Sequence, residues 1–209
     1  MKSRGVSTEV QGRAGAALAM LDVAEVPAGL RALDALAKEA PIHVHGAGTI
    51  QGGRFLILFG GEVEPVNFAF AKALAGAGAA LWDQVLLPDA EPRLLPAIED
   101  AALRWPAPGD TLGALQAGSP PTLLRALDAA LKGTAVELVQ LRIAEGLGGK
   151  AIAMLWGETA EVEAAMSLGY DAFARGRSEG CTGSVIRNAD LEVGRAIAPW
   201  SGFFQGWRG

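Results

Sequence analysis

Two histidines, His43 and His45, are the residues whose type and spacing best suit metal binding. They are separated by one residue on a segment with strand character. Alternate side chains of a strand point to the same face, so the two rings could share a metal ion. A site needs at least one more ligand, and no Cys, Asp or Glu stands nearby at a suitable spacing. We therefore interpret both as ordinary strand residues and predict no metal site.

Other catalytic chemistry lacks its usual components. A Ser-His-Asp arrangement cannot be assembled, because the only histidines are these two strand residues. The single cysteine, Cys181, follows Ser178-Glu179-Gly180 in a predicted loop, where a lone thiol is usually inert. One cysteine also excludes an internal disulfide and fits a reducing cytosol. The sequence therefore predicts that the protein is not an enzyme.

Glycine-rich segments at 46–53 and 146–149 invite a phosphate-binding interpretation. Neither ends in the lysine-serine pair of a P-loop, and neither forms G-x-G-x-x-G in a strand-to-helix turn. Each is predicted to be a loop that joins one strand to the next. The glycines therefore indicate strand connections and not a nucleotide site.

The surrounding pattern predicts the same order of elements twice. Pro27 suits the first turn of a helix, and Leu30, Leu33 and Leu36 fall on one face of it. We expect each half to be an α+β unit with helices on one face of a mainly antiparallel sheet. The predicted elements are a strand (17–23), helix (27–38), strand (42–44), strand (55–59), helix (63–81) and strand (84–87), followed by a strand (111–116), helix (121–132), strand (136–141), strand (151–156), helix (160–175) and strand (184–187).

A repeat explains this double order. Residues 31–35, Arg-Ala-Leu-Asp-Ala, return as 125–129, and Lys38 and Lys132 keep the same offset of 94 residues. Further on, residues 58–60 match 155–157 at an offset of 97, which predicts three extra residues in the second copy. A shared spacing of this kind is typical of one small domain built twice.

The repeat also predicts the domain organisation. Pro and Gly between the copies are typical of a linker, and the last residues carry four aromatic side chains in a short stretch that we expect to pack on its own assembly. The predicted parts are a loose N-terminus (1–13), a first domain (14–98), a linker (99–110), a second domain (111–198) and an aromatic C-terminal tail (199–209).

Composition excludes several classes of protein. Half of the 209 residues are apolar, which is ample for a core, and the formal net charge is −5. The absence of a basic block argues against nucleic acid as a partner. No apolar run approaches the ~20 residues that span a bilayer, and the first residues lack the hydrophobic region of a signal peptide. We expect a cytoplasmic protein with no membrane partner.

The ordered motifs of the second copy resemble a bacterial microcompartment shell domain. In that family a D-A-x-x-K helix end precedes a V-E-L-V strand, a glycine-rich loop, an apolar strand ending in glycine and an A-V-x-A-A helix. The first copy resembles the family more loosely, and together the copies cover roughly residues 16–197. The matching segments are 126–132, 136–139, 148–151, 157–158 and 162–165 in the second copy, and 34–38, 42–44, 51–53 and 60–64 in the first.

The resemblance implies a structural protein of the tandem class, in which three chains close into a ring of six domains that forms a hexagonal tile. Its partners would be further copies of itself and other shell proteins, in a microcompartment shell in the cytoplasm. The family places the helix-end lysine at the tile edge, so the implied edge residues are Lys38 and Lys132, with Arg187 beside them in the second copy. The unpermuted order of elements resembles the single-layer type.

In this family the strand-to-strand loops converge on the symmetry axis and line a pore for metabolites. No cysteine stands in either loop, so we predict no iron–sulfur cluster and no cofactor. The implied pore-lining residues are Thr49, Ile50, Gln51, Gly52, Gly53 and Arg54 from the first copy, and Glu145, Gly146, Leu147, Gly148, Gly149 and Lys150 from the second.

The same residues also allow purely structural interpretations and other functions. Each lysine could simply end a helix, favoured by its dipole, and each loop could be an ordinary glycine connection. A tandem α+β protein that senses a small molecule at the glycine-rich loops is the alternative function, and an enzyme with an unrecognised site is a third.

Overall fold

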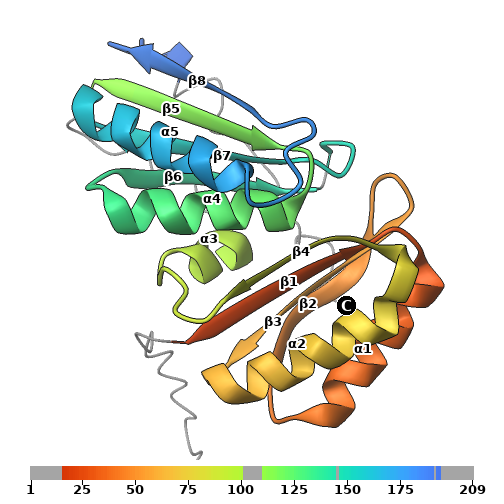
Figure 1. Cartoon of the computed structure of the whole chain (residues 1–209). Helices are drawn as coiled ribbons and strands as arrows, with labels where there is room; N and C mark the ends of the chain where they lie inside the picture. The colour runs from red at the N-terminus through yellow and green to blue at the C-terminus, as the bar shows by residue number, and fades with distance from the viewer. Residues whose placement is uncertain (1–15, 101–109, 145, 191, 194–209) are drawn as a thin grey trace, which may run out of the picture.

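The computed structural model describes residues 16–100, 110–144, 146–190 and 192–193. Two four-stranded sheets dominate it, with the strand orders β2-β3-β1-β4 and β6-β7-β5-β8. We call them sheet A and sheet B. Every neighbouring pair of strands is antiparallel. Each sheet carries two long helices on one face (Figure 1). The prediction of two α+β copies is confirmed.

The first copy repeats the predicted order with small changes at the ends. Its last strand is followed by a short helix, α3, that the sequence analysis did not predict. The elements are β1 (Ala17–Val23), α1 (Val26–Glu39), β2 (His43–Ile50), β3 (Arg54–Gly61), α2 (Val63–Ala77), a 3-10 turn η1 (Gly78–Ala80), β4 (Leu81–Leu87) and α3 (Leu94–Asp100).

The second copy repeats the order of strands and long helices. Its first helix, α4, has the same fourteen-residue length as α1 and begins 94 residues later. The elements are β5 (Thr111–Ala117), α4 (Pro120–Gly133), β6 (Glu137–Ile143), β7 (Ala151–Gly157), α5 (Thr159–Phe173) and β8 (Thr182–Arg187).

Two predicted boundaries in the first copy were wrong. The loop predicted at 46–53 is mostly strand, because β2 continues to Ile50 and only Gln51, Gly52 and Gly53 form the turn. Glycine does not prevent this, since the hydrogen bonds of the ladder come from the backbone and β3 lies alongside. The helix predicted at 63–81 ends at Ala77, and Gly78, with a positive φ of 55°, closes it by donating its N–H to the Leu74 carbonyl.

The strand pairing also corrects the repeat. Leu18 lies opposite Gly60 in sheet A, and Leu112 lies opposite Trp156 in sheet B. Leu18 and Leu112 are 94 residues apart, so Trp156 is the counterpart of Gly60 at an offset of 96. The second copy therefore has two extra residues, not three. Both fall in the tip of its β6–β7 hairpin, because only the tip can lengthen without shifting the ladder.

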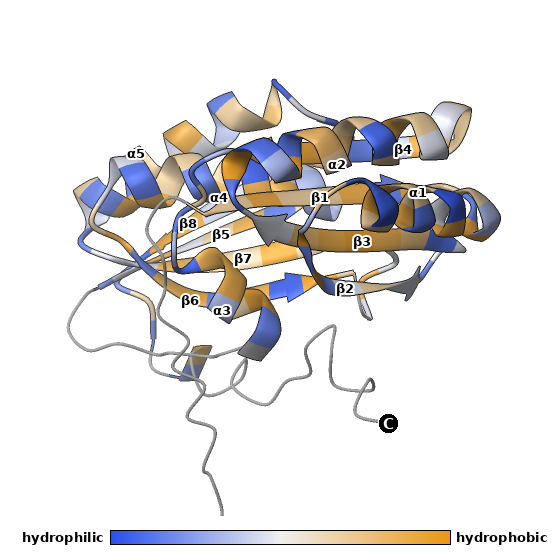
Figure 2. Ribbon diagram, turned by 90° about the horizontal axis from the view of Figure 1, so that it is seen from below, coloured by the Kyte–Doolittle hydropathy of each residue, from blue (hydrophilic) through white to orange (hydrophobic). Residues whose placement is uncertain are grey.

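The helices pack through small residues. Ala28, Ala32 and Leu36 of α1 are fully buried against the apolar strands, and Gly29 lies so close to Phe55 that an added Cβ would be 2.5 Å from the Phe55 Cβ. Figure 2 shows hydrophobic strands and helices that carry hydrophobic bands alternating with hydrophilic ones. This pattern is the expected one for helices that bury one face on a sheet.

The second copy covers the face of sheet A that its own helices leave open. Helix α4 packs against β4 and β1 and lies between sheet B and the first copy (Figure 1). Leu18, Met20 and Leu58 from sheet A share one buried cluster with Leu124 and Leu131 from α4. The two copies thus share a hydrophobic core, and α4 is buried on two sides.

Candidate functional site: the paired hairpins and the junction beneath them

The first hairpin has a three-residue tip. Ile50 pairs with Arg54 at the end of the ladder, and Gln51, Gly52 and Gly53 connect them. Gly52 has φ 86° and Gly53 has φ 73°, values at which any side chain would be strained. The tip requires glycine at both positions, and neither has another atom within 4 Å of an added Cβ.

The second hairpin has a longer tip. The backbone N–H of Ala144 donates to the Lys150 carbonyl at 2.8 Å and closes it. Gly146, Gly148 and Gly149 all have positive φ. Glu145, one of the predicted pore residues, lies outside the described residues.

The two tips contact each other. The backbone N–H of Gly148 donates to Gln51 Oε1 at 2.7 Å, and Arg54 Nη2 donates to the Gly149 carbonyl at 2.6 Å. An added Cβ on Gly149 would lie 2.1 Å from Arg54 Nη2. Segments almost one hundred residues apart therefore meet at one end of the molecule (Figure 1).

The remaining predicted pore residues lie in different environments. Thr49 and Lys150 are exposed and Leu147 is half-buried. Ile50 is only 8% exposed and belongs to the shared core, so its side chain points away from the tip. Arg54 is also buried, and its guanidinium reaches below the tips.

Below the tips lies a buried carboxylate, Asp22 of β1. Its side chain is fully buried, and neither of its oxygens has a hydrogen-bond partner among the described residues. Arg54 Nη2 is 3.4 Å from Asp22 Oδ2. Burial raises the pKa of Asp22 to about 7, and the charge of Arg54 opposes that rise. Asp83 raises the same pKa further, and Arg177 lowers it.

An aromatic ring joins the two copies beside this carboxylate. Trp82 belongs to β4, whereas Arg177 follows α5 in the second copy. The Arg177 guanidinium carbon lies 3.8 Å from the centroid of the Trp82 ring, and that of Arg54 lies 5.2 Å away. Both distances suit cation–π attraction. Trp82 therefore links the two arginines across the contact between α4 and sheet A, which we call the junction.

Hydroxyl groups of the second copy bind the other carboxylate of the cluster. Asp83 Oδ2 accepts hydrogen bonds from Ser119 Oγ and, at 2.7 Å, from Thr122 Oγ1. Asp83 Oδ1 accepts from the N–H of Gln84 at 2.7 Å. Ser119 and Thr122 are fully buried. We call Asp83, Ser119 and Thr122 the polar lock.

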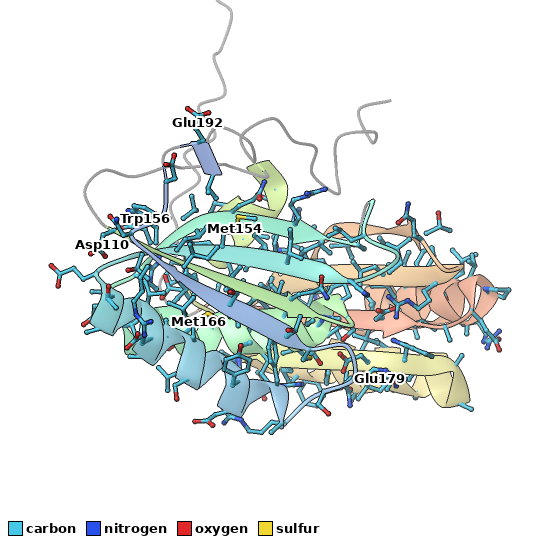
Figure 3. The ribbon with its side chains drawn as sticks, turned by 90° about the horizontal axis from the view of Figure 1, so that it is seen from above. Asp110, Met154, Trp156, Met166, Glu179 and Glu192 are labelled. Atoms are coloured by element: carbon cyan, nitrogen blue, oxygen red, sulfur yellow. The ribbon has the colours of Figure 1, made fainter. Side chains whose placement is uncertain are left out.

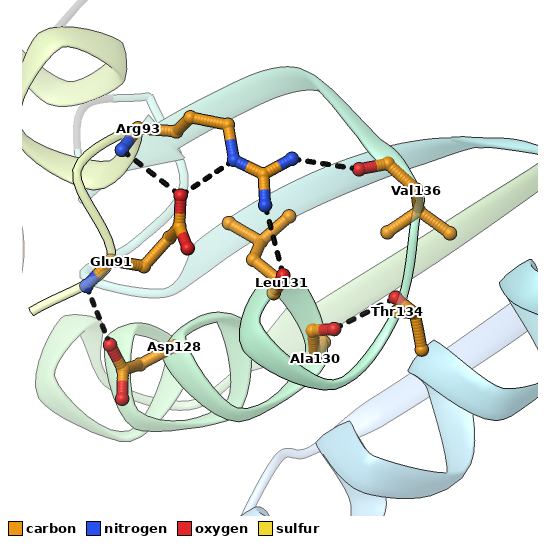
Figure 4. Close-up of polar contacts among 7 residues, drawn as sticks. All are labelled: Glu91, Arg93, Asp128, Ala130, Leu131, Thr134 and Val136. Carbon is orange, nitrogen blue, oxygen red and sulfur yellow. Dashed lines mark hydrogen bonds and ion pairs between the residues drawn. The ribbon is translucent and has the colours of Figure 1, made fainter.

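The far end of the junction is held by Arg93, at the start of α3. Its guanidinium donates to the carbonyls of Leu131 and Val136, both at 2.9 Å (Figure 4). The backbone N–H of Glu91 donates to Asp128 Oδ1 at 2.8 Å. The bond to Leu131 saturates a carbonyl in the last turn of α4, where carbonyls lack partners within the helix.

The predicted edge residues differ in their contacts. Lys132 Nζ donates to the Asp89 carbonyl of the first copy and to Asp128 Oδ2 at 2.9 Å. Among the described residues Lys38 pairs with Asp34 alone, at 2.7 Å, and its side chain is 74% exposed. Arg187 Nε donates to Glu163 at 2.9 Å on the surface of the second copy.

The two histidines lie in contact, with ring centroids 4.6 Å apart. His45 Nδ1 is 3.2 Å from Glu99 Oε1, a partner 54 residues away that the sequence spacing did not reveal. Burial lowers the pKa of His45, as does the charge of His43, while Glu99 raises it. Within the described part of the chain, no group of three or more His, Cys, Asp or Glu side chains could hold a metal ion.

Sequence reasoning missed the cluster of two buried carboxylates, Asp22 and Asp83, beside the partly exposed ring of Trp82. One signal was available, because Asp22 interrupts an otherwise apolar strand at residues 17–23. A charge in such a strand is expensive to bury unless it is paired. Its partners lie elsewhere in the chain, so the sequence could indicate the position but not the network.

Among the described residues, no long helix covers the face of sheet B opposite α4 and α5, although Ala189 and Val193 pack there against Leu112 and Trp156. Met154 and Trp156 point to that face, whereas Met166 of α5 lies on the other (Figure 3). Ile186 on the same open face is 40% exposed, and Leu30 on α1 is 52% exposed. The fold and the site define a duplicated α+β protein with one junction filled within the chain, while Leu30 and Ile186 on the matching surfaces stay exposed among the described residues.

Comparisons with known proteins agree with this architecture. The profile of the BMC domain family matches residues 17–90 and again 111–189. The chain is 30% identical over 156 residues to the bacterial microcompartment shell protein PduT of Citrobacter freundii. This match covers 75% of this chain and 84% of that protein. The chain therefore belongs to the BMC domain family, with two copies in tandem.

Solved structures show the same relation. A microcompartments protein from Desulfitobacterium hafniense superposes with a TM-score of 0.73 at 27% identity, covering 86% of this chain and 98% of that one. A fused permuted hexameric shell protein from the RMM microcompartment has a TM-score of 0.59 at 23% identity, covering 78% and 83%. The second likeness concerns the fold alone.

Membership of this family establishes the class of function. The protein is a structural component of a bacterial microcompartment shell, and its family assembles with other shell proteins. Among the described residues, no helix is long and apolar enough to cross a membrane. The predicted recognition and structural role are confirmed.

Proposed function

We propose that three copies of this chain close into a ring of six domains, which forms one tile of a microcompartment facet with a metabolite pore at its centre. The tile works without a catalytic site of its own. Its six domains would be residues 14–98 and 111–198 of each chain. The observation that carries this proposal is that the surfaces of the filled junction occur a second time, and that the described residues cover this second set only in part.

The helix side of the junction is duplicated on α1. Leu124 and Leu131 of α4 are buried against the first copy, at 1% and 2% exposure. Their counterparts 94 residues earlier are Leu30, which is 52% exposed, and Ala37, which is also exposed. Apolar side chains left open on a helix that is otherwise well packed indicate a partner surface.

The polar contacts of α4 are duplicated too. Arg125 Nη2 donates to the Gln84 carbonyl at 2.7 Å, and its counterpart Arg31 is exposed. Lys132 contacts the Asp89 carbonyl, and its counterpart Lys38 is exposed. The helix α1 therefore carries an unused copy of this contact set.

The sheet side of the junction is duplicated on sheet B. Leu87 lies opposite Leu18 in sheet A and is 7% exposed, because α4 covers it. Ile186 lies opposite Leu112 in sheet B and is 40% exposed. Docking α1 of one chain on sheet B of the next would cover it. Contacts of this head-to-tail kind generate rings when the rotation closes.

Closure at three chains is supported by the family. One solved relative with fused domains is described as hexameric, and three two-domain chains supply six domains. Such a ring would bring six hairpin tips together, since the two tips of one chain already touch. We propose that these tips line the pore, with Gln51 and the longer second tip nearest its opening.

Mass measurement with a matched pair of variants tests the ring. We expect light scattering after size-exclusion chromatography to give three times the 21.5 kDa of one chain. Leu30→Asp should yield monomers, because a charge would be buried in each junction. Phe68→Asp is the control, since Phe68 is 56% exposed but lies on α2, outside both junctions. A ligand-stabilised dimer, or a Leu30→Asp trimer, would refute the proposal.

The tile edge is a separate part of the proposal. We propose that Lys38, Lys132 and Arg187 contribute to contacts between tiles. Lys38→Ala combined with Lys132→Ala removes one polar contact from each junction, so the trimer should still form well above its dissociation midpoint, while the growth of sheets seen by electron microscopy is impaired. Sheets that grow as readily as those of the parent protein would contradict this role.

A further inference from the structure

The polar lock uses an unusual residue arrangement. Ser119 is the N-cap residue of α4, a position where serine normally bonds to the first turn of its own helix. Here its side chain makes no such bond and donates to Asp83 instead. Asp83 is only 8% exposed. The cap residue thus serves the junction and not the helix.

The open junction has residues at the equivalent positions. Glu25 is the N-cap residue of α1 and stands 94 residues before Ser119. Thr182 lies opposite Gln116 in sheet B, as Asp83 lies opposite Asp22 in sheet A. Thr182 is therefore the counterpart of Asp83. The carboxylate and the hydroxyl have changed sides.

Both groups are available for a partner. Glu25 and Thr182 are exposed, and Gln116 is half-buried. The Glu25 side chain makes no cap hydrogen bond. Among the described residues, neither Glu25 nor Thr182 has a side-chain hydrogen bond or an ion pair.

We infer that the Glu25 carboxylate of one chain accepts hydrogen bonds from the Thr182 hydroxyl and the Gln116 amide of the next, forming an exchanged copy of the polar lock between chains. This inference rests on the proposed ring and names the residues that select its partner surface. It requires a second copy of this chain, because the lock needs both a helix and a sheet that are still open.

The filled and the open junction each have one carboxylate acceptor and two hydrogen-bond donors. In the filled junction one carboxylate on the sheet meets two hydroxyl donors on the helix. In the open junction Ala28 replaces Thr122 on the helix, so the second donor must come from the sheet, where Gln116 provides an amide. A carboxylate on both sides would place like charges in a desolvated site, which disfavours a wrong pairing.

Three variants test the exchange. Thr182→Asp should raise the concentration at which half of the trimer dissociates by about ten-fold or more, because two carboxylates would then face each other. Glu25→Ser should have a smaller effect, about three-fold to ten-fold. The double variant, Glu25→Ser with Thr182→Asp, reproduces the residue types of Ser119 and Asp83. We expect it to dissociate at a lower concentration than Thr182→Asp alone.

Controls separate this inference from the ring itself. Ala71→Asp adds the same charge on an exposed site of α2 and should leave the dissociation midpoint unchanged. Thermal melting of diluted, monomeric protein checks that every variant folds. If the parent chain is a trimer and Thr182→Asp dissociates like the parent, or the double variant is no better than Thr182→Asp, the inference is wrong while the ring stands. If the parent chain never forms a trimer, the proposed ring is itself refuted, and the inference that rests on it falls with it.

Discussion

Helices α1 and α4 have the same length and the same Arg-Ala-Leu-Asp-Ala core, yet they have different environments. Leu124 of α4 is 1% exposed, whereas its counterpart Leu30 of α1 is 52% exposed. Each helix packs on its own sheet, and α4 also packs against β1 and β4 of the other copy. The difference shows that the repeated helix carries two apolar faces. One face packs on the helix's own sheet in both copies, whereas the second face is buried within the chain for α4 and exposed for α1.

Shortening these two leucines should give the largest contrast. Leu124→Ala should lower the free energy of unfolding by about 2–5 kcal/mol, because it leaves a cavity in the shared core. Leu30→Ala should change the stability of dilute, monomeric chain by less than about 0.5 kcal/mol. Urea unfolding of both variants at low protein concentration measures the contrast. Equal losses would mean that α1 is buried in the monomer.

The buried acid of the filled junction should give a pH-dependent effect. Because the pKa of Asp22 is raised to about 7, the folded chain retains a proton that the unfolded chain loses near pH 4. Its contribution to stability therefore falls as pH rises from about 4 to 7, and each pKa unit corresponds to about 1.4 kcal/mol. Asp22→Asn removes this dependence.

Unfolding curves of Asp22→Asn and the parent protein should therefore diverge with pH. Between pH 5 and pH 8 we expect the free energy of unfolding of the variant to rise relative to that of the parent by a few kcal/mol. Gln116 occupies the equivalent position of the second copy and does not titrate, so Gln116→Asn is the control and should show no such trend. A constant difference between the Asp22 variant and the parent would argue against a raised pKa.

The two hairpin tips should respond unequally to a methyl group. Gly149→Ala strains a residue with φ 82° and pushes against Arg54, so it should cost about 2–4 kcal/mol. Gly52→Ala strains its backbone in the same way, but its Cβ meets no atom within 4 Å, so about 1–2 kcal/mol is expected. Thermal unfolding compares them. If Gly52→Ala proved the more harmful, the contact between Arg54 and the second tip would be unimportant.

The smallest contrast concerns the two lysines. Lys132→Ala should cost about 0.5–1.5 kcal/mol in the single chain, because it removes the bond to the Asp89 carbonyl. Lys38→Ala removes only an exposed pair with Asp34 and should cost about 0–0.5 kcal/mol. In the trimer the two losses should approach each other, since Lys38 would then contact the next chain. If the destabilisation by Lys132→Ala still exceeded that by Lys38→Ala at high protein concentration, the junction within the chain and the junction between chains would not be equivalent.

The sequence by itself determined the fold class and the duplication. The spacing of Leu30, Leu33 and Leu36 correctly predicts a helix, although Leu30 lies off its buried face, and the offset of 94 residues between Lys38 and Lys132 is reproduced by α1 and α4. These features are local or periodic, so each can be recognised without knowing what lies nearby in space. The motifs of the second copy were sufficient to predict the family.

Only the tertiary structure decided the register, the buried network and the roles of the two helices. The offset of 97 residues was wrong by one because residues 58–60 and 155–157 look alike, and only the pairing of β1 with β3 and of β5 with β7 gives the register. The contact of Asp83 with Ser119 joins residues of different copies. Such contacts depend on how α4 docks on sheet A, and docking is determined by complementary surfaces that no single segment contains.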